Sequence, residues 1–420
     1  MPAQPESSDV PVIVVGGGPV GMVAAAALAR HGIRVVLVES EPVPQTDWRA
    51  STFHPATLEL LDGLGVVEQM HAEGLTVPVY QFRDRTEGLV AEFDFGLLAA
   101  ETPYPYRLQL NQQHLVRMLH ERLAATPGVE LRFGTSVTAI AAEAGGAWVQ
   151  LQGQAGSGQL RAGFVIGADG ATSSVRRLLD IGFDGFTYPE QFLIASTSVD
   201  MREVLPGLAD VNYIADPVQW LFLLRTREAW RAVWPVPADR PDSEATDPAT
   251  LQAQLQGIAQ YPPGYPITDH QIYRVHQRIA STFRLGRAVL VGDAAHINSP
   301  IGGVGLNSGI HDALDVTARL ARILREGAPV DPELDEFADV RRRVALEYVQ
   351  ADTQRNTERL READEERRQR NRAQLREIAA DPERARAWVR RVSLLESVQR
   401  FGVGRRPERA NTATSTGSHR

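Results

Sequence analysis

The sequence predicts an α/β protein with a parallel, doubly wound sheet, an inserted domain of mostly antiparallel β-sheet, and a helical region at the C-terminus. Three observations predict this fold class. An apolar run at residues 10–15 leads into a glycine-rich turn and a helix. The order of strand, glycine turn and helix recurs twice further along the chain. Residues 183–277 differ, with short alternating strands and many aromatic side chains.

The first of these segments is the most specific. Gly16, Gly18 and Gly21 form a G-x-G-x-x-G motif between the strand at residues 10–15 and an alanine-rich helix, and a second strand ends in Glu39. In this order the glycines allow a tight turn and a close approach of backbone to a pyrophosphate, which the helix N-terminus attracts. An acid at the end of the second strand suits ribose hydroxyls. The segment therefore predicts a Rossmann-like dinucleotide-binding domain for FAD or NAD(H).

Composition excludes several other functions. The chain of 420 residues has a formal net charge of -8, which argues against nucleic acid or an anionic membrane as partner. It contains no cysteine, so thiolate metal sites, disulfides and cysteinyl flavin links are excluded, and no metal site is expected. It contains no lysine either, which excludes Schiff-base enzymes and phosphate-loop NTPases. With no secretory signal or membrane helix expected, we predict a cytoplasmic protein.

The middle of the nucleotide-binding region supplies two further segments. A helix headed by Gln112 is followed by two strands, and Val137 lies in the second of them. The next strand, turn and helix carry Asp169 and Gly170 at the turn. Gln112 could point into a site or cap its helix, and most strand valines are core residues.

The third glycine segment, from Gly286 to Leu314, combines unusual residue types. A strand ends in Gly292 and Asp293, and Pro300 precedes a glycine-rich loop that leads into a long helix. Glycines let backbone lie flat against a ring, and the helix N-terminus stabilises an anion there. Asp293 is placed to accept a hydroxyl or, alternatively, to cap the next helix.

Together the three segments resemble the fingerprints of class A flavoprotein aromatic monooxygenases, the family of para-hydroxybenzoate hydroxylase. The resemblance covers residues 9 to about 345, in the same order and spacing. It implies non-covalent FAD, NAD(P)H as co-substrate, and hydroxylation of a phenolic or heteroaromatic small molecule by O₂ through a flavin C4a-hydroperoxide. The protein would chiefly position the substrate and exclude water.

The resemblance also implies site residues. The residues expected at the cofactor are Gly16, Gly18, Pro19, Val20, Gly21, Glu39, Arg49, Gln112, Val137, Asp169, Asp293, Gly305, Leu306 and Asn307. The carbonyl of Pro300 is expected to line the reaction site. A base that deprotonates a phenol is expected nearby, and His54 and His296 are the candidates, each with the alternative of a structural histidine.

The aromatic-rich region is expected to choose the substrate. Tyr213, Trp220, Arg225 and Trp234 are its candidate contacts, although core packing is the commoner fate of strand aromatics. The predicted cofactor domain comprises residues 9–80, 105–182 and 278–345, and the substrate domain residues 81–104 and 183–277. Residues 346–404, rich in both charge signs, are predicted to form solvated helices, and residues 405–420 a disordered tail.

Some alternatives stay open. A flavin halogenase is disfavoured because the chain has no lysine and its "WRAVWPVP" lacks the W-x-W-x-I-P spacing. A reductase or epoxidase of the same fold, or a non-catalytic flavin-binding protein, remains an alternative. The sequence does not choose NADH or NADPH, the aromatic substrate, the ring position, or the oligomeric state, for which a homodimer is the candidate.

Overall fold

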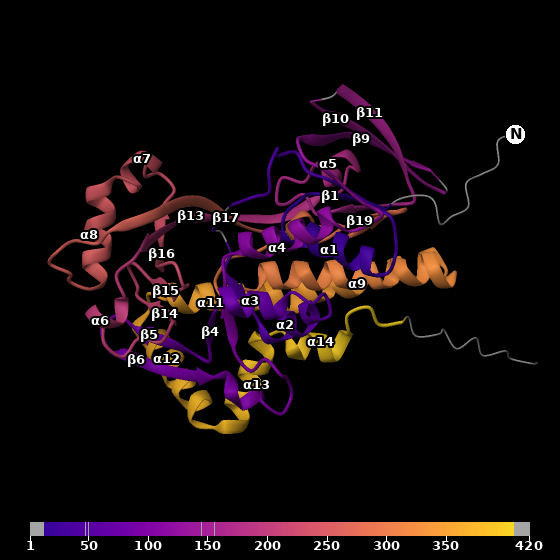
Figure 1. Cartoon of the computed structure of the whole chain (residues 1–420). Coiled ribbons are helices and arrows are strands. Elements are labelled where there is room, and N and C mark those ends of the chain that lie inside the picture. Colours follow the sequence, from indigo (N-terminus) through magenta and orange to yellow (C-terminus); the bar gives the residue numbers. More distant parts are fainter. Residues whose placement is uncertain (1–11, 47, 49, 144, 155, 407–420) are drawn as a thin grey trace, which may run out of the picture.

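The computed structural model describes residues 12–46, 48, 50–143, 145–154 and 156–406, which form four β-sheets surrounded by helices (Figure 1). Two of these sheets are large and lie at different ends of the view, and the helix α9 (Gly305–Glu326) runs beneath the first of them. The mixed α/β class predicted from the sequence is confirmed.

The first large sheet contains the predicted nucleotide-binding strands. It has six strands in the order β18-β19-β12-β1-β2-β8, all parallel except β18. The strands are β1 (Val12–Val15), β2 (Val35–Val38), β8 (Val129–Arg132), β12 (Phe164–Gly167), β18 (Arg284–Leu285) and β19 (Ala288–Leu290). Both β1 and β2 are buried along their whole length, as expected for a parallel sheet covered on both faces. The helices α1 (Pro19–Arg30), α4 (Gln112–Ala124) and α5 (Ser174–Leu178) accompany it, with α1 packed against α9.

Two small antiparallel sheets adjoin it. The first has the order β11-β10-β9, and the second has the order β3-β7-β4. Their strands are β9 (Thr135–Glu143), β10 (Gly146–Gly153) and β11 (Gly156–Ala162), and β3 (Thr52–Phe53), β4 (Leu75–Val77) and β7 (Arg107–Gln109). The short helices α2 (Pro55–Asp62), α3 (Val67–Glu73) and η1 (Phe95–Leu98) lie in the same part of the chain.

The second large sheet has eight strands in the order β20-β17-β13-β16-β15-β14-β5-β6. They are β5 (Val79–Asp84), β6 (Gly88–Asp94), β13 (Phe183–Thr197), β14 (Val211–Ala215), β15 (Leu221–Arg225), β16 (Trp230–Pro237), β17 (Ile267–Ala280) and β20 (His296–Ile297). The antiparallel meander expected at residues 211–237 is present as β14, β15 and β16. The parallel pairing of β14 with β5 was not foreseen.

The two faces of this sheet are covered differently. One apolar cluster, containing Trp234, packs with the helix α8 (Pro248–Ile258) and its neighbours α6 (Met201–Val204) and α7 (Asp242–Ala245). The other cluster, containing Tyr213, packs with the C-terminal helices. Alternation along the strands assigns each aromatic residue to one face or the other.

The C-terminal region differs from the solvated helices predicted for it. Its elements are α10 (Val330–Val344), the π-helical segment η3 (Ala345–Gln350), α11 (Ala351–Arg361), α12 (Glu365–Ala380), α13 (Pro382–Val392) and α14 (Leu395–Phe401). Leu375 and Val389 are buried in the cluster on the eight-stranded sheet, so the charged run is a cover for that sheet. The prediction failed because sparse apolar positions on several short helices give no single periodic signal.

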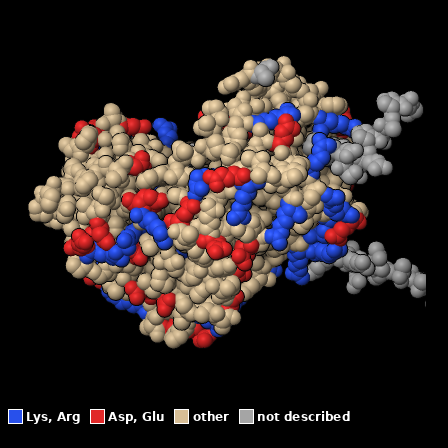
Figure 2. Space-filling view, in the orientation of Figure 1, with Lys and Arg blue, Asp and Glu red and all other residues tan. Residues whose placement is uncertain are grey.

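The charges are nevertheless mixed, as the sequence indicated. Figure 2 shows acidic and basic side chains intermingled over one face of the molecule. Residues 405 and 406 of the predicted disordered tail contact the folded chain. The Arg322 guanidinium donates to the backbone carbonyls of Gly404 and Arg405, and Arg406 pairs with Glu326. Residues 407–420 lie outside the described residues.

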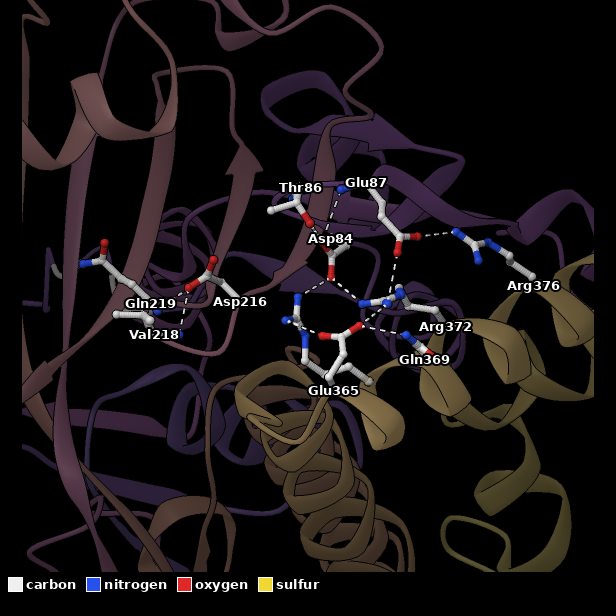
Figure 3. Close-up of polar contacts among 11 residues, drawn as sticks. Asp84, Thr86, Glu87, Asp216, Val218, Gln219, Glu365, Gln369, Arg372 and Arg376 are labelled. Carbon is white, nitrogen blue, oxygen red and sulfur yellow. Dashed lines mark hydrogen bonds and ion pairs between the residues drawn. The ribbon is translucent and has the colours of Figure 1, made fainter.

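A buried carboxylate fixes α12 to the hairpin of β5 and β6. Asp84 Oδ2 accepts hydrogen bonds from Arg368 at 2.8 Å and from Arg372 at 3.1 Å, and its Oδ1 accepts one from Thr86 at 2.7 Å. Figure 3 shows Arg372 and Glu365 of α12 turned toward Asp84 and Glu87. Burial raises the pKa of Asp84, but the hydrogen bonds from Thr86 and Arg368 outweigh it and hold the pKa well below its ordinary value.

We expect Asp84→Asn to destabilise the protein by about 1–3 kcal/mol at neutral pH, because two largely buried guanidinium groups lose a shared charge partner. Since the folded-state pKa of Asp84 is lowered, this stabilisation is present above about pH 4, the unfolded-state pKa, and is lost as the pH falls below it. Urea unfolding at neutral and acidic pH measures the difference between wild type and variant.

The matched control is Glu366→Gln on the same helix, whose side chain is 85% exposed against 1% for Asp84. It should change the free energy of unfolding by less than about 0.5 kcal/mol. Equal effects of the two substitutions would contradict the role of Asp84.

Candidate functional site

The first glycine motif closes a tight turn between β1 and α1. Gly16 has φ +110°, and a Cβ there would lie 2.3 Å from the Ala168 carbonyl oxygen. A Cβ on Gly21 would lie 1.9 Å from the Gly16 carbonyl oxygen. Only glycine allows this packing. Helix α1 begins with Gly18 as N-cap and Pro19 at its first position, with no side-chain cap and no acid in its first turn. Its N-terminal backbone therefore suits an anion.

Glu39 follows β2 beside this turn. Its side chain is 6% exposed, its Oε2 accepts a hydrogen bond from the Gly17 backbone N–H at 2.5 Å, and its Oε1 accepts one from Glu41 at 2.8 Å. The carboxylate thus joins the motif to the end of β2. Val20 packs against the third segment, since a Cβ on Gly292 would lie 3.1 Å from a Val20 methyl group.

The third segment brings Asp293 to the same region. The residue lies in η2 (Gly292–Ala294) and is exposed. The Gly292 backbone N–H donates to Asp312 Oδ2 at 3.0 Å, so α9 fixes the turn that carries Asp293. The turn thus holds Asp293 near the surface that the first motif shares.

The loop from Pro300 to Val304 is held by one amide side chain, that of Asn307 in α9. Asn307 Nδ2 donates to the carbonyls of Thr52 at 2.8 Å and Gly303 at 2.7 Å, and its Oδ1 accepts from the His54 backbone N–H at 2.9 Å. Gly302 and Gly303 have φ +114° and +65°, which favour glycine. The Pro300 carbonyl accepts from the Gly303 N–H at 3.0 Å, so it closes a turn.

Helix α9 starts directly after this loop, with Gly305 and Leu306 partly exposed at its first two positions. It has neither a side-chain cap nor an acid in its first turn. Because the helix is long and its first N–H groups lack a side-chain acceptor, its N-terminus favours negative charge.

The Asp169 turn is tied to α5. Asp169 accepts hydrogen bonds from the Ser173 hydroxyl at 2.5 Å and from the Ser174 backbone N–H at 2.6 Å. Arg176, missed as a site residue, donates to the Ala294 carbonyl at 2.8 Å and so links this turn to η2. The carboxylate of Asp169 therefore shapes the turn first, and any ligand contact is additional.

Three other expected cofactor residues are placed as follows. Gln112 is partly buried at the first position of α4, and its N–H donates to the Ala50 carbonyl at 2.8 Å. The Val137 side chain is 7% exposed in the core, on the edge strand of its sheet. Arg49 lies outside the described residues.

His54 is fully buried at the N-cap of α2. Its Nε2 lies 2.9 Å from the Gly302 carbonyl oxygen, which can only accept, so Nε2 carries the proton and Nδ1 the lone pair. Nδ1 has no partner among the described residues. Burial, and next the Arg107 guanidinium, lower the pKa of His54 well below its usual range. A neutral His54 holds the loop and is a poor acceptor of a full proton.

His296 is buried away from the loop. Its Nε2 lies 2.9 Å from Asp312 Oδ2, and Asp312 Oδ1 accepts from Arg341 at 2.6 Å. The ring stacks on Phe283 with an interplanar angle of 14°. The contacts of His296 are those of a group that supports the Gly292 turn, and it lines neither of the cavities described below.

A cavity opens beside Gly302. Its walls include the aromatic side chains Tyr80, Phe82, Tyr213 and Trp388. Arg107, with its side chain almost fully buried, also lines it. A flat, apolar space next to the loop suits an aromatic molecule.

Only one of the four expected substrate contacts, Tyr213, lines this cavity. Trp220 packs edge-on against Phe192 at 5.0 Å. Arg225 pairs with Asp210 at 3.4 Å, and Trp234 lies in the cluster under α8, on the opposite face of the sheet from Tyr213. None of these three lines the cavity: strand alternation turns Arg225 and Trp234 to the other face of the sheet, whereas Trp220, just before β15, packs in the same cluster as Tyr213.

Sequence reasoning missed Arg107, Tyr80 and Trp388. An arginine between Tyr106 and Leu108 in a short strand was a usable signal, since a charge at a strand position needs a reason. Trp388 had no signal, because only the fold brings α13 to this cavity.

No group of three or more histidine, aspartate or glutamate residues suited to a metal ion occurs in the described part of the chain. None of the described helices is long and apolar enough to cross a membrane.

The residues present fit a dinucleotide. The N-terminus of α1 has no acid and no side-chain cap, and a Cβ on Gly18 would have only one atom within 4 Å, so this turn suits phosphates. The exposed Asp293 carboxylate suits a hydroxylated chain. The N-terminus of α9, also without an acid or a side-chain cap, suits an anionic ring edge. Gly302 presents backbone without a side chain to the cavity, whereas a Cβ on Gly303 would lie 2.9 Å from Thr52 Cβ.

The buried His311 gives a pH-dependent prediction. Its Nε2 lies 2.9 Å from Thr57 Oγ1, and burial, followed by the Arg341 guanidinium, lowers its pKa to about 3. The unfolded chain binds a proton near pH 6.5 and the folded chain does not, so His311 makes stability fall as the pH drops below 6.5.

When the pH falls from 7.5 to 5.5, the free energy of unfolding of wild type should decrease by about 1.4 kcal/mol more than that of His311→Gln. Urea unfolding at the two pH values measures this difference. His270→Gln, at an exposed position, is the control and should follow wild type. Parallel pH dependence of wild type and His311→Gln would contradict the prediction.

Comparison with known proteins agrees with this geometry. The family model described as "FAD binding domain" matches residues 9–352. Para-nitrophenol 4-monooxygenase of Pseudomonas sp. strain WBC-3 is 33% identical over 374 residues, which cover 88% of this chain and 92% of that protein. The 6-hydroxy-3-succinoylpyridine 3-monooxygenase of Pseudomonas putida is 33% identical over 341 residues, covering 80% and 86% of the two chains.

Solved structures give the same result. The crystal structure of p-nitrophenol 4-monooxygenase from Pseudomonas putida superposes with a TM-score of 0.88 at 32% identity, over 94% of this chain and 99% of that one. A ternary complex of aklavinone-11 hydroxylase with FAD and aklavinone gives a TM-score of 0.72 at 30% identity, over 84% and 69%. The chain thus belongs to the FAD-binding family of flavoprotein aromatic monooxygenases, enzymes that use FAD, NAD(P)H and O₂ and have the fold of para-hydroxybenzoate hydroxylase.

Proposed function

We propose that this monooxygenase hydroxylates a small phenolic or hydroxylated heteroaromatic compound in the cavity beside Gly302. The observation that carries the proposal is the cavity itself, walled by aromatic side chains next to the glycine loop that precedes α9. The relatives named above act on para-nitrophenol and on a hydroxypyridine, both flat rings with a hydroxyl group. Aromatic side chains in its walls suit a flat compound of that kind.

We assign the cofactor contacts to three places. The N-terminus of α1 would hold the pyrophosphate, with Glu39 toward the adenosine ribose and Asp293 toward the ribityl chain. The N-terminus of α9 would lie at the flavin edge that becomes negative on reduction. Bound FAD supplies the redox chemistry between NAD(P)H and O₂.

The residues of the chain then position the substrate and exclude water from the cavity. The Pro300–Gly303 turn and the Asn307 amide fix the loop, and Tyr213 and Trp388 wall the cavity on the side of the sheet and α13. We assign His54 and His296 supporting roles, since each ring already contacts a protein oxygen. Pro300 remains our candidate for a residue at the reacting ring.

The location and assembly are also proposals. A chain without cysteine suits a reducing cytoplasm, and a homodimer is the assembly that we expect. Light scattering of the purified holoenzyme determines the mass in solution.

Purified protein should be yellow and should oxidise NADH or NADPH faster when an effective phenol is added. We expect isotopic oxygen from labelled O₂ in the product, because a monooxygenase transfers one of its two atoms. A panel of nitrophenols, hydroxypyridines and larger phenols, scored by nicotinamide consumed and by mass spectrometry of products, tests this. The proposal fails if the flavin-loaded protein responds to no member of the panel and forms no labelled product.

Asn307→Asp should weaken FAD binding by about tenfold or more, because a carboxylate cannot donate to the carbonyls of Thr52 and Gly303 and the loop loses two buried hydrogen bonds. Flavin fluorescence during titration of the apoprotein measures the affinity. Asn371→Asp on α12 is the control and should bind FAD as wild type does. Unchanged affinity in Asn307→Asp would contradict the proposed role of the loop.

A further inference from the structure

Arg107 carries a buried positive charge that no carboxylate balances. Its side chain is 2% exposed in β7, and among the described residues no acidic group lies within ion-pairing distance of it. Its one hydrogen bond runs from Nη1 to the Tyr213 hydroxyl at 3.4 Å, and its Nε has no partner. The guanidinium lies over the Tyr80 ring at 4.3 Å and the Phe95 ring at 5.1 Å.

Three other buried arginines are balanced by carboxylates. Arg319 contacts Asp315 at 2.9 Å, Arg341 contacts Asp312 at 2.6 Å, and Arg322 contacts Glu333 at 2.6 Å. A buried charge usually needs such a partner, because the guanidinium has lost its water. Ring faces compensate only partly. Arg107 therefore differs from these three arginines.

Two further arginines without a carboxylate partner, one buried and one partly buried, do not line the cavity beside Gly302. Arg231 donates to Ser51 Oγ at 3.3 Å and Asn111 Oδ1 at 3.4 Å. Arg359 lies over the Trp388 ring at 5.3 Å and lines a neighbouring cavity. Only Arg107 among these three combines an unbalanced charge with a place beside the loop.

The cavity contains one carboxylate, and it is already paired. Asp352 contacts Arg391 Nη2 at 3.0 Å and also pairs with Arg355. The remaining polar walls, Thr353 and Asn356, carry no charge. The charge balance of the cavity thus favours a negatively charged molecule in contact with Arg107.

We propose that Arg107 is the anion-binding residue of the substrate cavity, and that the enzyme takes its phenolic substrate as the phenolate, with the ionised oxygen on the Arg107 guanidinium. The substrate leaves its proton in the solvent, so no protein base is needed. A bound phenolate has a more electron-rich ring than the phenol, which suits attack on an electrophilic oxygen. This inference rests on the proposed function and names its substrate class and specificity residue.

The histidines support this assignment. His54, the imidazole nearest to Arg107, has its Nε2 on the Gly302 carbonyl, and His296 has its Nε2 on Asp312. Neither is placed to take a net proton from a ring in the cavity. Fixed positive charge within about 4–6 Å lowers the pKa of an acid by about 1–3 units, and this would hold a bound phenol in its anionic form.

The test uses the FAD-loaded enzyme and 4-nitrophenol, whose phenolate absorbs visible light. Difference spectra across a pH series give the pKa of the bound probe, and equilibrium dialysis gives its affinity beside that of 4-nitroanisole, the neutral methyl ether. For wild type we expect a lowered probe pKa and at least about tenfold tighter binding of the phenolate than of the ether. Arg107→Gln should abolish both effects, and Arg107→Lys should restore part of each.

Arg359→Gln is the control, since it also removes a partly buried arginine without a carboxylate partner, and it should keep the preference for phenolate. FAD content and the thermal midpoint of each variant show whether it is folded, and the charge-preserving Arg107→Lys provides a readout if Arg107→Gln is not. A wild-type preference for 4-nitrobenzoate over 4-nitrophenolate would overturn the phenolate assignment.

Two failures are distinguishable. If wild type binds and hydroxylates 4-nitrophenol but Arg107→Gln and Arg107→Lys keep the full phenolate preference, the role of Arg107 is wrong and the proposed function stands. If wild type binds no phenol of the panel and none stimulates nicotinamide oxidation, the proposed function itself fails, and the role of Arg107 fails with it.

Discussion

The amide of Asn307 is the contact on which the arrangement of the site depends. Its nitrogen and oxygen bind the backbone of residues 52 and 54 and, about 250 positions later in the sequence, that of residue 303. An amide can donate and accept at once, so it satisfies groups that a carboxylate or an apolar side chain would leave unpaired. The glycine loop and the start of α9 are thereby fixed relative to β3 and to the backbone of His54.

Buried charge is organised differently on the two sides of this loop. Toward α9 and α10, carboxylates and guanidinium groups are matched: Asp312 serves Arg341, His296 and the Gly292 backbone at once. Toward the eight-stranded sheet, Arg107 has aromatic rings and no acid. The matched side gives a rigid support for the cofactor surface, and the unmatched side retains the capacity to recognise an anion.

The C-terminal helices belong to the site and are more than an appendage. The π-helical segment at Ala345–Gln350 lies between α10 and α11, and residues just beyond it, Thr353 and Asn356, line the cavity. Such segments often occur at functional sites, since the extra residue changes which side chains face inward. The Asp84 cluster then fixes α12 to the hairpin of β5 and β6. The cavity wall is thus assembled from chain segments more than 200 residues apart.

The sequence by itself determined the class of the fold, the first glycine turn and the third glycine segment, because strand, glycine and helix signals there are local. Gly16 and Gly21 are required by contacts within a few residues or with the adjacent strand. Only the tertiary structure decided which polar and aromatic side chains meet. Strand alternation directs Tyr213 into the cavity and Trp234 under α8. The register of pairing between neighbouring strands determines which residues face each side of the sheet. Arg107 and Trp388 meet because α13 folds back over β5, a contact between distant segments that no local pattern encodes.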